Sequence, residues 1–143
     1  MKKFKFTLES ILGLKENMEE NEKMLLYRMK AELNALYLEL EELNNIYMRY
    51  VNERKASSKI GITIAKLKEI TQYIDEVDKK KALKQDEIEQ MQVTIDNQTE
   101  VLKQVRIEVK TLERLKENQL TAHNEMVSKE NELLIEDFIA GRI

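Results

Sequence analysis

Few side chains in this sequence could carry out chemistry. His123 is the only histidine and there is no cysteine, so neither a histidine metal cluster nor a thiolate nucleophile can form. The three glycines, Gly13, Gly61 and Gly141, are too scattered for a phosphate-binding loop. We therefore expect a protein that is not an enzyme and has no cofactor or metal, and we interpret His123 as a solvated helix residue.

Charged residues are abundant and of both signs. Acidic pairs such as Glu19-Glu20 recur with lysines at helical spacing, which is typical of solvated helix faces and of i,i+4 ion pairs. Residues 79–81 are three consecutive lysines that could bind an anion or form a solvated face, and neighbouring acids partly neutralise them. The formal net charge of −3 does not favour nucleic acid as a partner.

Tyrosines are the most informative polar side chains. Three of the five, Tyr47, Tyr50 and Tyr73, flank the middle of the chain. They could be helix-packing residues with hydrated hydroxyl groups. The alternative is a partner-binding patch, because tyrosine is favoured at protein interfaces.

The elements that would position these tyrosines are long α-helices. The chain has no proline, 36% charged residues and apolar residues at alternating spacings of three and four, which indicates a coiled coil. The first apolar stripe is Leu26, Met29, Leu33, Leu36, Leu40, Leu43, Tyr47 and Tyr50. Upstream, Leu8, Ile11, Leu14, Met18 and Leu25 follow a shifted phase, which predicts a stutter near residues 21–25.

A second stripe occupies the other half of the chain. Its members are Ile60, Leu67, Ile70, Ile74, Val77, Ile88, Met91, Ile95, Leu102, Val105, Val109 and Leu112. The same spacing puts Lys81, Lys84 and Gln98 at contact positions, where polar residues usually set the register or loosen the packing.

Between the stripes lies a cluster of Ser57, Ser58 and Gly61, which predicts a turn. We predict an all-α protein, a long antiparallel two-helix coiled-coil hairpin that forms a single domain over residues 1–143. Its first helix would cover about 5–56, its turn about 57–61 and its second helix about 62–139. We expect a monomer when free. One continuous helix that dimerises is the alternative.

Pairing the stripes places Tyr50 opposite Leu67 and Leu8 opposite Val109. The second helix is then the longer one, and it should project for roughly 25 residues, or about 38 Å, past the end of its partner. An apolar cluster without an intramolecular partner ends this projection, and it consists of Leu133, Leu134, Ile135, Phe138 and Ile139.

No stretch of 18 apolar residues occurs, and the basic N-terminal residues are not followed by the apolar core of a signal peptide. We therefore expect a cytoplasmic protein that does not insert into a membrane.

Three segments resemble the FliJ family of flagellar export proteins. They are residues 4–16 (FKFTLESILGLKE), residues 47–77 with Tyr47, Tyr50, Gly61, Ile62 and Tyr73, and residues 112–138 with LERLKE and the later Glu-Asp-Phe. The resemblance implies a soluble component of the flagellar type III export apparatus, with roles in flagellum biogenesis, protein transport and chemotaxis. Competing hypotheses are a generic coiled-coil tether, a stalk subunit of another rotary ATPase or type III secretion system, and an unrelated helical chaperone or adaptor.

The resemblance also implies the partners and where they bind. An antiparallel coiled coil of this family would sit in the pore of the hexameric export ATPase, contact the cytoplasmic domain of the export gate, and hand over export chaperones. It would thus associate peripherally with the inner face of the cell membrane. The tip candidates for gate binding are Leu43, Tyr47, Tyr50, Tyr73 and Val77. Those for ATPase binding at the terminal end are Leu133, Leu134, Ile135 and Phe138.

Overall fold

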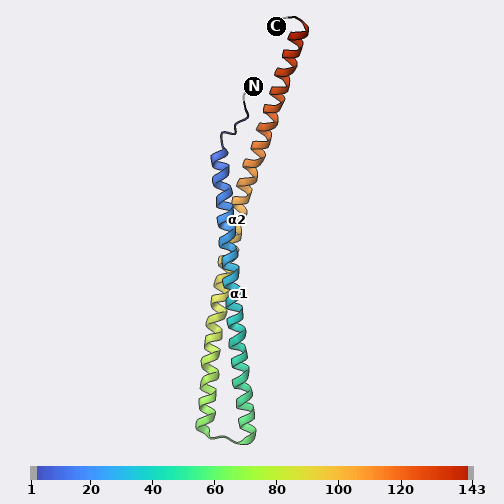
Figure 1. Ribbon diagram of the computed structural model, residues 1–143. Coiled ribbons are helices and arrows are strands. Elements are labelled where there is room, and N and C mark those ends of the chain that lie inside the picture. The colour runs from blue at the N-terminus through green and yellow to red at the C-terminus, as the bar shows by residue number, and fades with distance from the viewer. Residues whose placement is uncertain (1–2, 142–143) are drawn as a thin grey trace. The chain divides into compact units, whose positions relative to one another are not determined.

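The structure, a computed structural model, describes residues 3–141, which form two long helices. Helix α1 (Glu9–Ile60) and helix α2 (Ile64–Ile139) run antiparallel and are joined by residues 61–63 (Figure 1). The chain divides into two compact units. Unit 1 comprises Met1–Lys23 with Glu100–Ile143, and unit 2 comprises Met24–Thr99.

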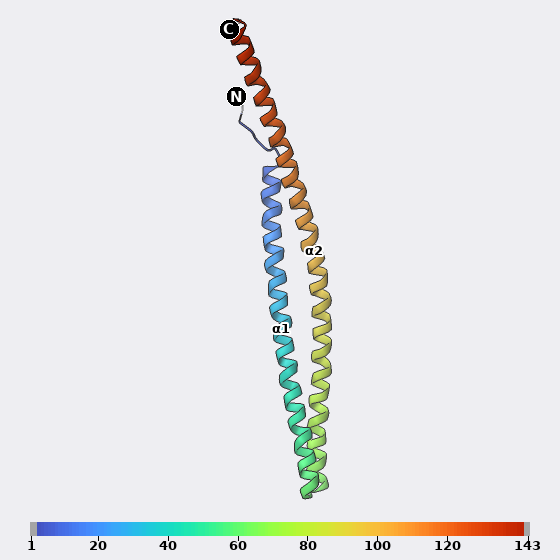
Figure 2. The same cartoon turned by 90° about the vertical axis from the view of Figure 1, so that its right-hand side faces the viewer.

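In each unit a part of α1 packs beside a part of α2, and both views show the paired ribbons (Figure 2). The predicted fold class, an all-α coiled-coil hairpin with a longer second helix, is confirmed. The single domain over residues 1–143 stays a prediction.

The connection between the helices lies later than the predicted 57–61. Ser57 and Ser58 are helical, and the Ser58 hydroxyl donates a hydrogen bond to the Arg54 carbonyl at 2.8 Å. The chain leaves the helix at Gly61, whose φ of 87° is left-handed and whose N–H donates to the Ser57 carbonyl at 3.0 Å. This is the αL cap for which glycine is preferred, so the glycine rather than the serines ends α1.

Thr63 opens α2 immediately after this cap. Its side-chain Oγ1 accepts a hydrogen bond from the backbone N–H of Lys66 at 3.2 Å, and its carbonyl accepts one from Leu67 at 3.1 Å. A threonine that satisfies the third backbone N–H of a helix is a favourable N-cap. The two caps together confine the connection to three residues.

Helix α1 begins at Glu9, four residues later than the predicted start near residue 5. Residues 3–6 are irregular, and the Glu9 N–H closes a turn on the Phe6 carbonyl at 3.2 Å. The Phe6 side chain is buried against Leu12, Val105 and Val109. The segment before α1 therefore contributes to the core of unit 1 from a non-helical backbone, which explains the later start of the helix.

The packing of unit 2 follows the two predicted stripes. Its buried apolar residues are Leu26, Ile70, Ile74, Val77, Ile88 and Ile95. The remaining members of the first stripe, from Met29 to Tyr50, are half-buried. This burial on alternating spacings of three and four is the a/d pattern of a coiled coil.

The pairing between the stripes differs from the prediction by about one heptad. Tyr50 stacks on Tyr73 instead of facing Leu67, and Lys84 forms an ion pair with Glu39. The later turn causes this difference, because moving the turn slides one stripe along the other. A slide of one heptad keeps both apolar stripes facing each other, so the hydrophobic pattern alone does not distinguish the two pairings.

In unit 1 the predicted phase of α1 is wrong. Ile11, Leu14 and Met18 are exposed, whereas the less exposed residues are Leu8, Leu12, Lys15, Glu19 and Glu22. These residues continue the spacing of Leu26 and Met29 along the same helix, so α1 has no stutter near residues 21–25.

Polar residues occupy these positions because they form ion pairs with α2. Lys15 pairs with Glu108 at 2.7 Å, Lys116 with Glu9 at 2.8 Å, and Arg106 with Glu19 at 3.3 Å. All six side chains are partly exposed, so each pair contributes little to stability by itself.

The Lys15–Glu108 pair predicts a pH dependence of stability. The hydrogen bond from Lys15 lowers the pKa of Glu108 below its ordinary value of 4.5. Because the folded pKa is depressed, the stabilisation is present above the unfolded pKa and is lost as the pH falls through the folded pKa. We expect Glu108→Gln to reduce the fall in Tm on acidification, measured by circular dichroism. Glu125→Gln should leave this fall unchanged, and an equal effect of both would contradict the assignment.

Glycine 13 should be replaceable with a gain in stability. It lies inside α1, and a Cβ added there would meet nothing within 4 Å. Glycine inside a helix costs about 0.5–1 kcal/mol relative to alanine. We expect Gly13→Ala to raise the free energy of unfolding by this amount, and Gly61→Ala, at φ 87°, to lower it. Denaturant titration measures both, and destabilisation by Gly13→Ala would contradict the expectation.

Candidate partner-binding sites

Two tyrosine rings meet near the loop of unit 2. Tyr50 of α1 and Tyr73 of α2 stack with ring centroids 5.5 Å apart and planes 16° apart. The Tyr73 hydroxyl donates a hydrogen bond to Glu69 Oε1 at 3.5 Å, and Tyr73 is 42% exposed. The stacked pair thus joins the two helices and leaves part of an aromatic surface open to solvent.

Tyr47 lies one turn from Tyr50 on α1 and has a cation above its ring. The ammonium nitrogen of Lys81 is 4.2 Å from the ring centroid, which is a cation–π contact. Lys80 instead lines a groove, and Lys79 is exposed. Lys81 is thus the one of these three lysines that contacts Tyr47, and an anion site at residues 79–81 stays a prediction.

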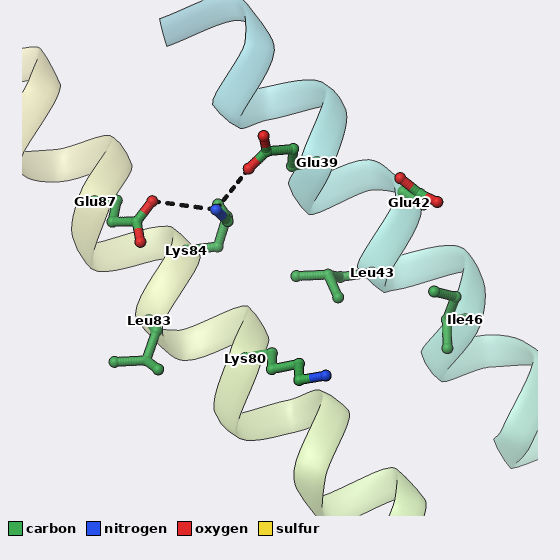
Figure 3. A pocket seen from close by; sticks show the side chains of 8 residues that line it. All are labelled: Glu39, Glu42, Leu43, Ile46, Lys80, Leu83, Lys84 and Glu87. Atoms are coloured by element: carbon green, nitrogen blue, oxygen red, sulfur yellow. Dashed lines mark hydrogen bonds and ion pairs between the residues drawn. The ribbon is translucent and has the colours of Figure 1, made fainter. Parts of the chain in front are cut away.

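A groove of about 440 Å³ lies between the helices further from the loop. Leu43 and Ile46 of α1 and Leu83 of α2 are its apolar lining (Figure 3). Its charged lining is Glu39, Glu42, Lys80, Lys84 and Glu87. An apolar centre with a charged rim suits an aliphatic or aromatic side chain of a protein partner.

Lys84 organises one edge of this groove. Its ammonium group lies 2.6 Å from Glu39 and 3.1 Å from Glu87 (Figure 3). The hydrogen bond with Glu39, followed by that with Glu87, raises the pKa of Lys84 above its ordinary value of 10.5. The charge of Lys84 and its contribution to stability are thus complete at neutral pH and are lost only as the pH rises through this raised pKa. Two of the three groove carboxylates are therefore already paired.

The structure brings most of the predicted tip residues together, but their side chains differ in how far they are exposed to solvent. Leu43, Tyr47 and Tyr50 are half-buried, and Tyr73 is exposed. Val77 is only 8% exposed, so it supports the packing between the helices and offers little surface.

Sequence reasoning did not select Ile46 or Leu83 as site residues, although both line the groove. Ile46 adjoins Tyr47 and Leu83 adjoins Lys84 in the sequence, so each is an apolar residue immediately beside a contact position. That adjacency is the signal that could have identified them.

The predicted terminal residues are all open to solvent. Leu133, Leu134, Ile135 and Phe138 are each more than half exposed near the end of α2. Helix α2 ends at Ile139, and Gly141 follows with a φ of 71°, the left-handed conformation that glycine favours past the end of a helix.

His123 is not the solvated residue that the sequence predicted. Its ring centroid lies 5.6 Å from that of Phe4, which belongs to the irregular segment before α1, and the residue is half-buried. The N-terminal segment therefore extends the packing of unit 1 along α2 beyond the start of α1.

These features define a class: helical-hairpin coiled coils whose exposed apolar surfaces suit other proteins. Residues 3–141 contain no group of three or more side chains suited to a metal ion. Within the same range, neither helix has an apolar stretch sufficient to cross a bilayer.

This chain belongs to the FliJ family, because the family model described as the flagellar FliJ protein matches residues 4–140. No significant match to a curated protein or to a solved structure was found. The family confirms the resemblance seen in the sequence. Membership makes the protein a component of the flagellar export apparatus.

Proposed function

We propose that this chain is a coiled-coil stalk that links the flagellar export ATPase to the export gate. Family membership supports the export apparatus as its setting. The observation that carries the proposal is the pair of exposed apolar surfaces, one in each unit. The first is the tip patch, which we define as Leu43, Ile46, Tyr47, Tyr50, Tyr73 and Leu83, and the second is the terminal segment, residues 133–139.

The tip patch is assigned to the cytoplasmic domain of the gate. Tyrosine dominates binding energies at interfaces because it buries a large area at a low cost in side-chain entropy. The Tyr50–Tyr73 stack holds both rings before a partner arrives, which reduces that cost further. Val77, proposed from the sequence, is buried and acts in this scheme only through the packing of the two helices.

The terminal segment is assigned to the ATPase ring. Leu133, Leu134 and Phe138 offer a run of large apolar side chains at the end of a helix, and such side chains bind by entering pockets of a partner. In this arrangement the protein is cytoplasmic, is held at the inner face of the membrane through the apparatus, and passes export chaperones to the gate.

Separate titrations of the full chain against the gate domain and against the ATPase test the two assignments. We expect binding to both, with Phe138→Asp weakening only the ATPase complex. Substitution of Tyr47, Tyr50 and Tyr73 by alanine should weaken only the gate complex. If the folded wild-type chain binds neither protein, the stalk proposal is wrong.

A further inference from the structure

One stripe of side chains on the outer face of α1 in unit 2, away from the packed stripe, is almost free of charge. Nine positions at alternating spacings of three and four form this outer stripe, and only Glu41 among them is charged. They are Met24, Tyr27, Ala31, Asn34, Leu38, Glu41, Asn45, Met48 and Asn52. The outermost positions of a two-helix coiled coil contact only water and are ordinarily charged or polar.

The large apolar members of the outer stripe are well exposed. Tyr27 is 79% exposed, Leu38 65%, Met24 54% and Met48 52%. Three of the other positions are asparagines, which are also exposed. Asparagine within an apolar helical stripe is a known means of fixing the register of a helix pair.

Helix α2 provides an internal comparison, because it has the same kind of partner in the same unit. Its nine corresponding outer positions are Lys68, Gln72, Asp75, Lys79, Ala82, Asp86, Glu89, Val93 and Asp96, and six of them are charged. These two stripes of nine positions thus carry one charged residue on α1 and six on α2. This difference points to a requirement on α1 that pairing within the hairpin does not impose.

The charges that flank the outer stripe indicate what covers it. The flanking positions are Arg28, Lys30, Ala35, Tyr37, Glu42, Asn44, Arg49 and Val51, of which three are basic and one is acidic. Among the ion pairs described for residues 3–141, none involves Arg28, Lys30 or Arg49. A second copy of α1 would bring basic flanks against basic flanks, whereas acidic flanks on a different helix would complement them.

We propose that the outer stripe of α1 binds an amphipathic helix of a different protein, one with a three-four apolar repeat and acidic flanking residues. The partner helix would lie beside α1 in unit 2, so that α1 contacts α2 on one side and the partner on the other. Tyr27 and Leu38 contribute the largest apolar contacts, and Arg28, Lys30 and Arg49 pair with its carboxylates. This surface lies on the opposite side of α1 from its contact with α2 and does not depend on the gate or ATPase assignments.

A pair of designed peptides tests both the apolar stripe and the charge. Each peptide is a three-heptad helix with leucine at its a and d positions, and its flanking e and g positions carry either glutamate or lysine. Fluorescence anisotropy measures their binding to the full-length chain. Leu38→Gln removes an apolar contact without adding charge. Val93→Gln is the matched control, because Val93 is 59% exposed at a corresponding position of α2.

We expect the glutamate peptide to bind the wild-type chain at least about tenfold more tightly than the lysine peptide does. Leu38→Gln should weaken this binding about tenfold, and Val93→Gln should change it by less than about twofold. Double substitution of Tyr50 and Tyr73 by alanine should leave it intact, which separates this surface from the tip patch. Circular dichroism verifies that each variant remains helical.

Three outcomes would overturn the proposal. The first is that the two peptides bind equally tightly, or that neither peptide binds. The second is an equal effect of Leu38→Gln and Val93→Gln. The third is a wild-type dimer in light scattering that Leu38→Gln dissociates, because it would make a second copy the occupant of the outer stripe.

Discussion

Replacing Tyr50 and Tyr73 together by alanine should weaken binding to the cytoplasmic domain of the export gate at least about 30-fold, or about 2 kcal/mol. The two rings stack across the helices with one of them substantially exposed, so both would be buried by a partner. Each single substitution also removes the stacking partner of the remaining ring. The combined effect should therefore be smaller than the sum of the two single effects. Isothermal titration calorimetry of the wild type, the two single variants and the double variant measures how strongly the two tyrosines depend on each other in binding the gate.

Tyr37→Ala is the matched control for this cycle. Tyr37 is 49% exposed on α1, similar to Tyr73, but lies outside the tip patch. Its substitution should change gate affinity by less than about twofold. Equal losses for Tyr37→Ala and for Tyr73→Ala at unchanged helicity would mean that the tip patch has no special role.

Leu12→Ala should lower the free energy of unfolding by about 2–4 kcal/mol, whereas Ile11→Ala should lower it by less than about 1 kcal/mol. Leu12 is 3% exposed within the cluster that includes Phe6, Val105 and Val109. Ile11 precedes it in the sequence and is 45% exposed. Because a two-helix structure has no deep core, the loss of one buried leucine is a large part of its stability.

Chemical denaturation measures both changes, and hydrogen exchange shows where they act. We expect Leu12→Ala to increase exchange chiefly in the parts of α1 and α2 that belong to unit 1. A larger loss of stability for Ile11→Ala than for Leu12→Ala would instead support the shifted phase inferred from the sequence.

These two neighbouring residues show why the upstream phase was mispredicted. The sequence offers apolar side chains at Ile11, Leu14 and Met18, and a search for hydrophobic spacing selects them. The structure instead turns Lys15 and Glu19 toward α2, where Glu108 and Arg106 pair with them. Hydrophobic pattern alone cannot reveal contact positions held by ion pairs between residues far apart in the sequence.

The fold class could be predicted because its determinants are local. Apolar stripes from Leu26 to Tyr50 and from Leu67 to Leu112 predict two long helices with one apolar face each. The serines predict the turn a few residues too early, because serine is favoured in turns but is also tolerated in helices. Ser58 remains helical by donating to the Arg54 carbonyl, and only the positive φ of Gly61 ends α1.

The candidate site could be predicted in part. Tyr47, Tyr50 and Tyr73 were recognised by residue type, but the tyrosine stack and the groove depend on the pairing of the helices. A pairing that differs by one heptad gives each residue a different neighbour while preserving the apolar pattern. Lys81 above Tyr47 and Lys84 beside Glu39 are therefore contacts that the sequence does not specify.

Hydrogen exchange of the chain with and without the gate's cytoplasmic domain, read by mass spectrometry, shows which surface binds the gate. We expect slower exchange on binding in residues 39–50 and 69–84, which carry the tip patch and groove, and little change in residues 124–139. Protection confined to residues 124–139, or none at gate concentrations that saturate the complex, would contradict the assignment of the tip patch to the gate.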